Sequence, residues 1–297
     1  MDNSLHSSVV EMDETIQSWE KHKIYSDKVM RAMIGDDFLL RHVNHMSNCA
    51  NKLAITYDGV EAGYCRDRMC PMCQWRRSRK QYGLLMDTIS CLSYQYLMLT
   101  VTRPNRPGSE LRDEIRRLNQ ALMKMLRRPV FAPVKGIQRN VEVTYNIEAE
   151  TYHPHIHALL AVNPTYFDSR EYIPREVWVS EWNAANGWDK QLMGYDLQVD
   201  IRKVKDTSGI AELSKYVTKP MNIDPNTPVA VKHLRTLSGQ LHGARLIGRT
   251  GDVAKAASDS REAYKAQFSG GEEGGGRQGR VVMCEWDMER KRYDILL

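Results

Sequence analysis

The sequence lacks any long apolar run, and this absence argues against one class of protein. No uninterrupted apolar stretch approaches the roughly 18–20 residues that a membrane span needs. The first twenty residues are acidic and polar, whereas a secretory signal starts with basic residues and continues with apolar ones. We therefore expect a chain that is neither secreted nor membrane-bound and that works in the cytoplasm. With 297 residues, of which 42% are hydrophobic, it can bury one large core or two modest ones.

Cysteine is also scarce, and six cysteines are too few for a disulfide scaffold in a chain of this length. Four of them nevertheless lie close together: Cys49, Cys65, Cys70 and Cys73. The Cys-Pro-Met-Cys pair has the spacing of a zinc knuckle, and the other two cysteines complete a four-thiolate set. Two alternatives stay open. His42 or His45 could replace Cys49 as a ligand, and the pair could instead be a thioredoxin-type redox site, although no βαβ pattern precedes it.

Acidic residues are nearly absent from the segment that follows. Between Cys65 and Lys80 only Asp67 is acidic, and the local surplus of positive charge equals the net charge of the whole chain, +5. Basic charge concentrated beside a metal knuckle predicts a polyanionic partner, above all nucleic acid, and the alternative is a solvated helix face. The candidate DNA-binding residues are Arg66, Arg68, Arg76, Arg77, Arg79 and Lys80.

One amphipathic helix is predicted after residue 110. Its apolar residues recur at intervals of three and four: Leu111, Ile115, Leu118, Leu122 and Met125. The opposite face, from Arg112 to Arg128, is basic and is a second candidate for binding phosphates.

Five segments are typical of strands: 96–104, 140–148, 154–162, 195–204 and 281–287. A short polar link joins the second to the third, which predicts an antiparallel hairpin. Because side chains alternate along a strand, His155 and His157 share one face and can bind one metal ion. We expect Glu142, on the facing strand, to be the third ligand. His153 could position substrate instead.

A short helix is predicted over residues 207–220. Glu212, Tyr216 and Lys219 line up on one side of it at intervals of four and three. Alone, such a row is typical of a solvated helix face. Beside a metal site the same row is consistent with a nucleophilic tyrosine, because a phenol with a pKa of about 10 is a useful nucleophile only with help from a cation or a base.

A family resemblance emerges from the order of several blocks along the chain. CPMCQWRRS, YLMLTVTRP, EVTYN, TYHPHIHALLAVN, QVDIR and ELSKYVTK together resemble the rolling-circle replication initiators of small bacterial plasmids, Rep proteins of the HUH endonuclease superfamily. The resemblance implies an α+β fold with a central, ferredoxin-like or RRM-like antiparallel sheet of about five strands. It places helices on one side of the sheet and the histidine strand in its middle. The Cys-rich segment would be a zinc-binding insertion.

The resemblance also assigns roles. His155 and His157 would bind Mg²⁺ or Mn²⁺, Tyr216 would be the nicking nucleophile, and Glu212 would take the place of a second tyrosine. Glu142 as third ligand rests on strand geometry and on related HUH enzymes that use a carboxylate there. The implied activity is site-specific nicking and joining of DNA through a 5′-phosphotyrosine, which leaves a 3′-OH primer. The implied partners are single-stranded or cruciform origin DNA, host helicase and polymerase, and a second copy of the chain, in a bacterial cytoplasm.

Composition suggests three parts: an N-terminal helical and Cys-rich zinc module (1–92), a nuclease core (93–222) and a C-terminal extension that completes the fold (223–297).

Two other functions use the same features. One is an HUH transposase or relaxase, against which the cysteine block and Glu212 both argue. The other is a non-catalytic zinc-knuckle DNA-binding regulator, in which Tyr216 and the HPHIH strand would have no catalytic role and their pattern would be a coincidence.

Overall fold

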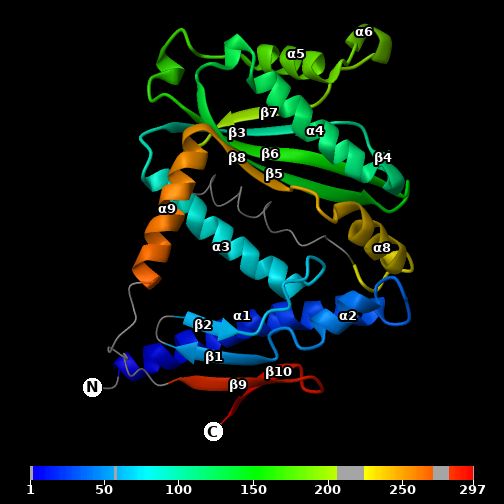
Figure 1. The fold of residues 1–297 in the computed structure, drawn as a ribbon, viewed down its shortest axis with the longest axis vertical. Coiled ribbons are helices and arrows are strands. Elements are labelled where there is room, and N and C mark those ends of the chain that lie inside the picture. The colour runs from blue at the N-terminus through cyan, green and yellow to red at the C-terminus, as the bar shows by residue number, and fades with distance from the viewer. Residues whose placement is uncertain (1–2, 57–58, 206–223, 270–280, 297) are drawn as a thin grey trace. The chain divides into compact units, whose positions relative to one another are not determined.

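The computed structural model describes residues 3–56, 59–205, 224–269 and 281–296 (Figure 1). The chain divides into two compact units. Unit 1 comprises residues 1–76, 223–238 and 273–297, and unit 2 comprises residues 77–222 and 239–272. Helices α3 (Pro71–Ser90) and α8 (Ala230–Leu241) contribute residues to both. Among the described helices, none combines the length and the apolarity that crossing a membrane requires.

Unit 1 joins the two ends of the sequence in one antiparallel sheet. It contains helices α1 (Asn3–Met33) and α2 (Leu40–Met46) and the strands β1 (Lys52–Thr56), β2 (Gly59–Ala62), β9 (Val282–Asp287) and β10 (Arg292–Leu296), in the order β10-β9-β1-β2. The Trp286 indole donates to Asp27 at 2.9 Å, and the Tyr293 hydroxyl donates to the Ala50 carbonyl at 2.6 Å. These buried bonds tie the late strands to early residues.

Unit 2 is built on a second antiparallel sheet in the order β7-β3-β6-β5-β8. Its strands are β3 (Gln95–Thr102), β5 (Val134–Asn146), β6 (Thr151–Val162), β7 (Val199–Lys203) and β8 (Ile247–Thr250), and the short β4 (Arg106–Pro107) also pairs with β6. The predicted α+β fold with a central antiparallel sheet is thereby confirmed. Strand β6, which carries the histidines, lies in the middle of the order, as expected.

Helices cover both faces of this sheet, so the expectation of helices on one side is wrong. The later part of α3 packs Leu85 and Ile89 against Met98 and Leu159 on one face. Helix α4 (Leu111–Leu126) packs against β6 on the other face, and all five residues of its predicted apolar stripe are buried (Figure 1). The physical reason is that β3 and β6 carry apolar side chains on both faces, and both faces need cover.

The remaining elements of unit 2 flank this sheet. Helix α5 (Arg175–Asn186) packs against α4, and α9 (Gly251–Ser269) packs against β5 and β8. Gly251 has φ +59°, and a Cβ atom there would lie 2.1 Å from the Lys135 carbonyl oxygen. Only glycine therefore allows α9 to begin so close to β5. Short helical turns complete the unit: 108–110, Pro129–Phe131, Tyr166–Asp168 and α6 (Lys190–Met193).

Several strand limits differ from the predictions. Strand β5 begins at Val134 rather than Asn140, because its polar first half pairs with both β6 and β8. Strand β7 begins at Val199 rather than at residue 195, because the backbone before it bonds to side chains, as when the Leu197 amide donates to Asn183. The pairing of β1 with β2 and of β9 with β10 was not anticipated.

Candidate functional site

The β5–β6 hairpin brings Glu142, His155 and His157 together on one face of the sheet. Glu142 lies directly opposite His155 in the strand pairing, and Asn140 lies opposite His157. The Nε2 atoms of His155 and His157 are 3.0 and 3.1 Å from the same oxygen, Oε2 of Glu142. All three side chains are buried or nearly so. The structure thus gathers the predicted metal ligands into one group.

Hydrogen bonds at the other ring nitrogens orient both imidazoles. Nδ1 of His155 lies 3.1 Å from the His153 carbonyl oxygen, which accepts its proton, and Nδ1 of His157 lies 3.0 Å from the Thr100 hydroxyl. The bond from Nδ1 to the His153 carbonyl favours the tautomer in which Nε2 of His155 carries the lone pair that a metal ion needs. Thr100 was not predicted, because its place opposite His157 depends on the pairing of β3 with β6.

The donor set fits a divalent cation. Two ligands at a right angle, each about 2.1 Å from an octahedral ion, lie about 3.0 Å apart, which matches both Nε2–Oε2 separations. Beside them Asn140 is 1% exposed, and neither polar atom of its amide has a hydrogen-bond partner in the described part of the chain. Buried polar atoms normally have hydrogen-bond partners, so the Asn140 amide is available to a water molecule or a substrate oxygen.

His153 belongs to the same strand but has a different environment. Burial lowers the pKa of His153 below the usual 6.5, and the neighbouring His155 lowers it further. A hydrogen bond with the Arg103 backbone raises this pKa but does not outweigh the other two effects. Its ring stacks on that of His155, with centroids 5.3 Å apart. His153 therefore lies beside the metal-ligand group, with its ring stacked against one of the ligands.

Glu212, Tyr216 and Lys219 all fall in the segment 206–223, which lies outside the described residues. The roles that the sequence predicts for them therefore stay predictions.

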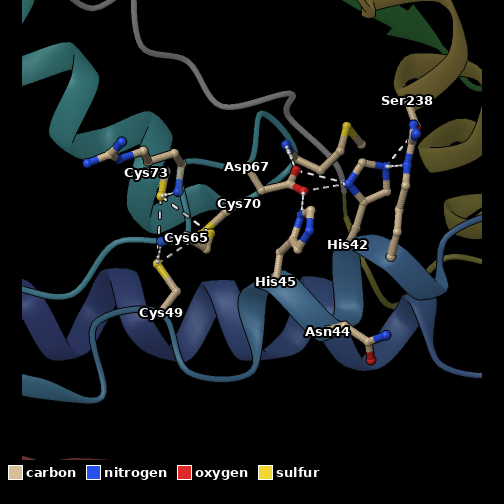
Figure 2. Close-up of polar contacts among 12 residues, drawn as sticks. His42, Asn44, His45, Cys49, Cys65, Asp67, Cys70, Cys73 and Ser238 are labelled. Carbon is tan, nitrogen blue, oxygen red and sulfur yellow. Dashed lines mark hydrogen bonds and ion pairs between the residues drawn. The ribbon is translucent and has the colours of Figure 1, made fainter.

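Four of the cysteines in unit 1, Cys49, Cys65, Cys70 and Cys73, form a second group (Figure 2). Sγ of Cys73 lies 3.6 Å from Sγ of Cys49 and 3.5 Å from Sγ of Cys65, and Sγ of Cys70 lies 3.6 Å from Sγ of Cys49. Four thiolates about 2.3 Å from a tetrahedral zinc ion would be about 3.8 Å apart, close to these values. Contacts among the sulfurs lower the pKa of the Cys70 thiol, chiefly through Cys49, and raise the pKa of the Cys65 thiol, again chiefly through Cys49.

The two histidines considered as substitute zinc ligands occupy a different position. Nδ1 of His42 and Nδ1 of His45 lie 2.8 and 2.9 Å from Oδ2 of Asp67, and Nε2 of His42 lies 2.7 Å from the Ser238 hydroxyl (Figure 2). Burial raises the pKa of the Asp67 carboxyl, but the bonds from His42, His45 and the Met69 amide outweigh it and hold that pKa below 3.8. Asp67 thus anchors the loop between Cys65 and Cys70 to helix α2.

The basic segment lies on the Cys65–Cys70 loop and on helix α3. Arg68 is half-buried, and its five basic partners, Arg66, Arg76, Arg77, Arg79 and Lys80, are exposed. The Arg76 guanidinium stacks over the Tyr64 ring, 4.0 Å from its centroid. Exposure leaves these side chains accessible to phosphates, while their role in DNA binding stays a prediction.

Comparison with known proteins identifies relatives along most of the chain. The model of a family described as "Replication protein" matches residues 59–294. A "Protein rep" from Staphylococcus aureus is 31% identical over 215 residues, which cover 66% of this chain and 92% of that protein. A "Protein rep" from Bacillus amyloliquefaciens is 30% identical over 84% of this chain and 79% of its own length, and one from Streptococcus pneumoniae is 38% identical over 55% and 54%. No solved structure gave a significant match. The chain therefore belongs to the Rep family of plasmid replication initiators.

Proposed function

We propose that the chain is a metal-dependent, site-specific DNA endonuclease and strand transferase that starts rolling-circle replication at a plasmid origin. The observation that carries this proposal is the convergence of Glu142, His155 and His157 on one point of the central sheet. Mg²⁺ and Mn²⁺ suit the carboxylate and imidazole donors. Membership of the Rep family favours an initiator over the transposase or relaxase alternative.

In this proposal the chain's own residues perform a phosphodiester exchange. Glu142, His155 and His157 hold the divalent ion, which when bound stabilises negative charge on the oxygens of the scissile phosphate. The Tyr216 oxygen attacks phosphorus in line, and the bond from phosphorus to the 3′ oxygen breaks. The leaving 3′ oxygen takes up a proton and becomes the 3′-OH that host polymerase extends behind the host helicase. The 5′ phosphate stays on Tyr216, and the Lys219 ammonium favours the phenolate.

Glu212 would end the cycle. A carboxylate within reach of the regenerated junction can act as general base for a water molecule. Hydrolysis, in contrast to a second tyrosine attack, leaves no new protein–DNA bond, so the enzyme stops after one round. A Glu212→Ala variant would then nick normally and terminate poorly. Equal loss of both steps would contradict this role.

The Cys group and the basic segment would serve binding. The thiolates of Cys49, Cys65, Cys70 and Cys73 would hold a structural Zn²⁺, which fixes the loop that carries Arg66 and Arg68. The exposed basic residues would then contact DNA phosphates, with an affinity that falls steeply with salt. A second copy of the chain at the origin completes the proposed assembly.

Covalent capture tests the proposal directly. The wild-type protein is incubated with Mn²⁺ and a supercoiled plasmid that carries the cognate origin, then denatured. We expect a protein–DNA adduct that protease removes. The adduct should be absent with Tyr216→Phe and present with Tyr172→Phe, which alters an exposed tyrosine of unit 2. An adduct that persists in Tyr216→Phe would exclude this nucleophile. No adduct with the wild type would favour the non-catalytic zinc-knuckle DNA binder.

A further inference from the structure

A basic groove of about 870 Å³ lies in unit 2, between helix α4 and the segment 242–245. Among the residues that the structure describes, neither aspartate nor glutamate lines it. Its basic side chains come from α4, from β5 and from the residues that follow α8: Arg112, Arg116, Lys124, Arg127, Arg139 and Arg245. So many positive charges around one groove attract an anion, and the lining offers no carboxylate that would neutralise them.

Most of these charges have no acidic partner in the described part of the chain. Arg116 forms an ion pair with Asp113 at 2.7 Å. Arg112 instead donates to the backbone carbonyls of Gly239 and Gln240 at 2.5 and 3.2 Å, which fixes its position without cancelling its charge. Lys124, Arg127 and Arg245 form no ion pair with any residue that the structure describes, and all three are exposed. The groove is therefore both ordered and positively charged.

Arg139 gives the groove a built anion site. It is 8% exposed, and its Nη1 atom has no hydrogen-bond partner among the described residues. A Cβ atom at position 248 would lie 2.9 Å from the guanidinium carbon, so the glycine there makes room for the Arg139 head group. Burial lowers the pKa of Arg139, and nearby Arg245 lowers it further. The guanidinium lines the groove and has no ion pair among the described residues, so its positive charge favours an anion there.

The groove lies on the face of the sheet opposite the Glu142, His155 and His157 group. Residues along β5 alternate between faces, so Arg139 points away from the face that carries Asn140 and Glu142. The groove and the metal ligands are therefore separate sites within one unit.

The lining also distinguishes between two forms of DNA. Single-stranded DNA is usually held by aromatic side chains on which bases stack, and no Phe, Tyr or Trp of the described ranges lines this groove. Base-paired DNA presents its phosphates outward and is held through them by Arg and Lys. We propose that this groove binds the backbone of base-paired origin DNA and that Arg139 contacts one of its phosphates. The inference deepens the DNA-binding role proposed above and rests on it.

The test compares duplex and single-stranded binding by the full-length protein. Fluorescence anisotropy is measured with a labelled duplex and with one of its strands, over a series of salt concentrations. The variant Arg127→Gln/Arg245→Gln removes two groove charges. The control Arg170→Gln/Lys205→Gln removes two exposed charges of unit 2 outside the lining. We expect the groove variant to bind the duplex at least about tenfold more weakly. The slope of log affinity against log salt should fall by about 1.8 for two lost contacts.

Specific outcomes would overturn the inference. Equal losses in the groove variant and the control would mean that net charge alone is measured. A loss confined to the single strand would assign the groove to unpaired DNA. Arg139→Gln should weaken duplex binding further while thermal denaturation confirms that the variant is folded, and unchanged binding in that variant would remove Arg139 from the contact. Because these are binding measurements, failure of the proposed nicking activity would show separately, as a missing adduct in the covalent capture.

Discussion

His155 and His157 show what strand geometry lets a sequence predict at the scale of single residues. Alternation along a strand is a local property, so two histidines two residues apart had to share a face. The short link to the preceding strand then brought Glu142 opposite His155. Thr100 could not be found in this way, because its contact with His157 depends on the register between β3 and β6, which are far apart in sequence.

Replacing the carboxylate tests the metal group. Glu142→Gln keeps the size of the side chain but removes the charge of its oxygen ligand. We expect Mn²⁺ affinity to fall by at least about tenfold, because even groups that only orient a ligand are worth that much. Electron paramagnetic resonance of free Mn²⁺ measures it. Glu148→Gln, which changes an exposed glutamate of the same hairpin, should bind as the wild type does. Equal affinities in the two variants would rule Glu142 out as a ligand.

Thr100→Val tests the orienting hydrogen bond. Valine has the shape of threonine but leaves Nδ1 of His157 without its 3.0 Å partner. Mn²⁺ affinity should fall by about 10–100-fold, since the imidazole loses the bond that fixes its orientation. Thr102→Val, two residues along the same strand, is the matched control and should keep the wild-type affinity in the same titration. A Thr100→Val protein with unchanged Mn²⁺ affinity would show that the hydroxyl has no orienting role.

At the scale of elements, helix α4 and the unit 1 sheet contrast in what the sequence could predict. The stripe of α4 repeats within one helix, so both its limits and its buried face were predictable. In the sheet of unit 1, β1 pairs with β9, and these two strands come from opposite ends of the chain. No local pattern encodes such a pairing. The same limit hid β8, a four-residue strand containing Gly248 and Arg249 that forms only against β5.

Glu114 joins α4 to its neighbours and was not predicted as a core residue. Its side chain is fully buried and forms ion pairs with Arg103, at the end of β3, and with Arg106 and Arg117 at 3.6 Å. Glu114→Ala leaves the nearly buried Arg103 without its carboxylate and should destabilise the protein by about 3–5 kcal/mol in urea denaturation. Asp113→Ala, beside it on the surface, should cost about 1 kcal/mol or less. Similar losses of stability in the two variants would show that burial of the Glu114 ion pairs does not stabilise the protein.

At the scale of the whole molecule, the two units depend on different sources of stability. The core of unit 2 rests on fully buried apolar side chains such as Leu99, Ile156 and Leu160. Unit 1 has short strands, buries Cys49, Cys70 and Cys73 of its cysteine group, and contains ion pairs such as Lys23 with Asp27 at 2.8 Å. Binding of a structural metal contributes directly to folding in such a unit. A multi-unit chain of this kind need not unfold in a single step.

Metal removal should therefore act on one unit only. We expect about one zinc ion per chain by elemental analysis. Chelation should then remove protection against hydrogen exchange from β1, β9 and β10 while β3, β5 and β6 keep theirs, because the apolar core of unit 2 contains none of the four thiolates. Cys73→Ser should reproduce the effect without chelator, and Cys91→Ser, at an exposed cysteine, should not. A protein without zinc, or one in which chelation exposes both sheets equally, would contradict a structural metal confined to unit 1.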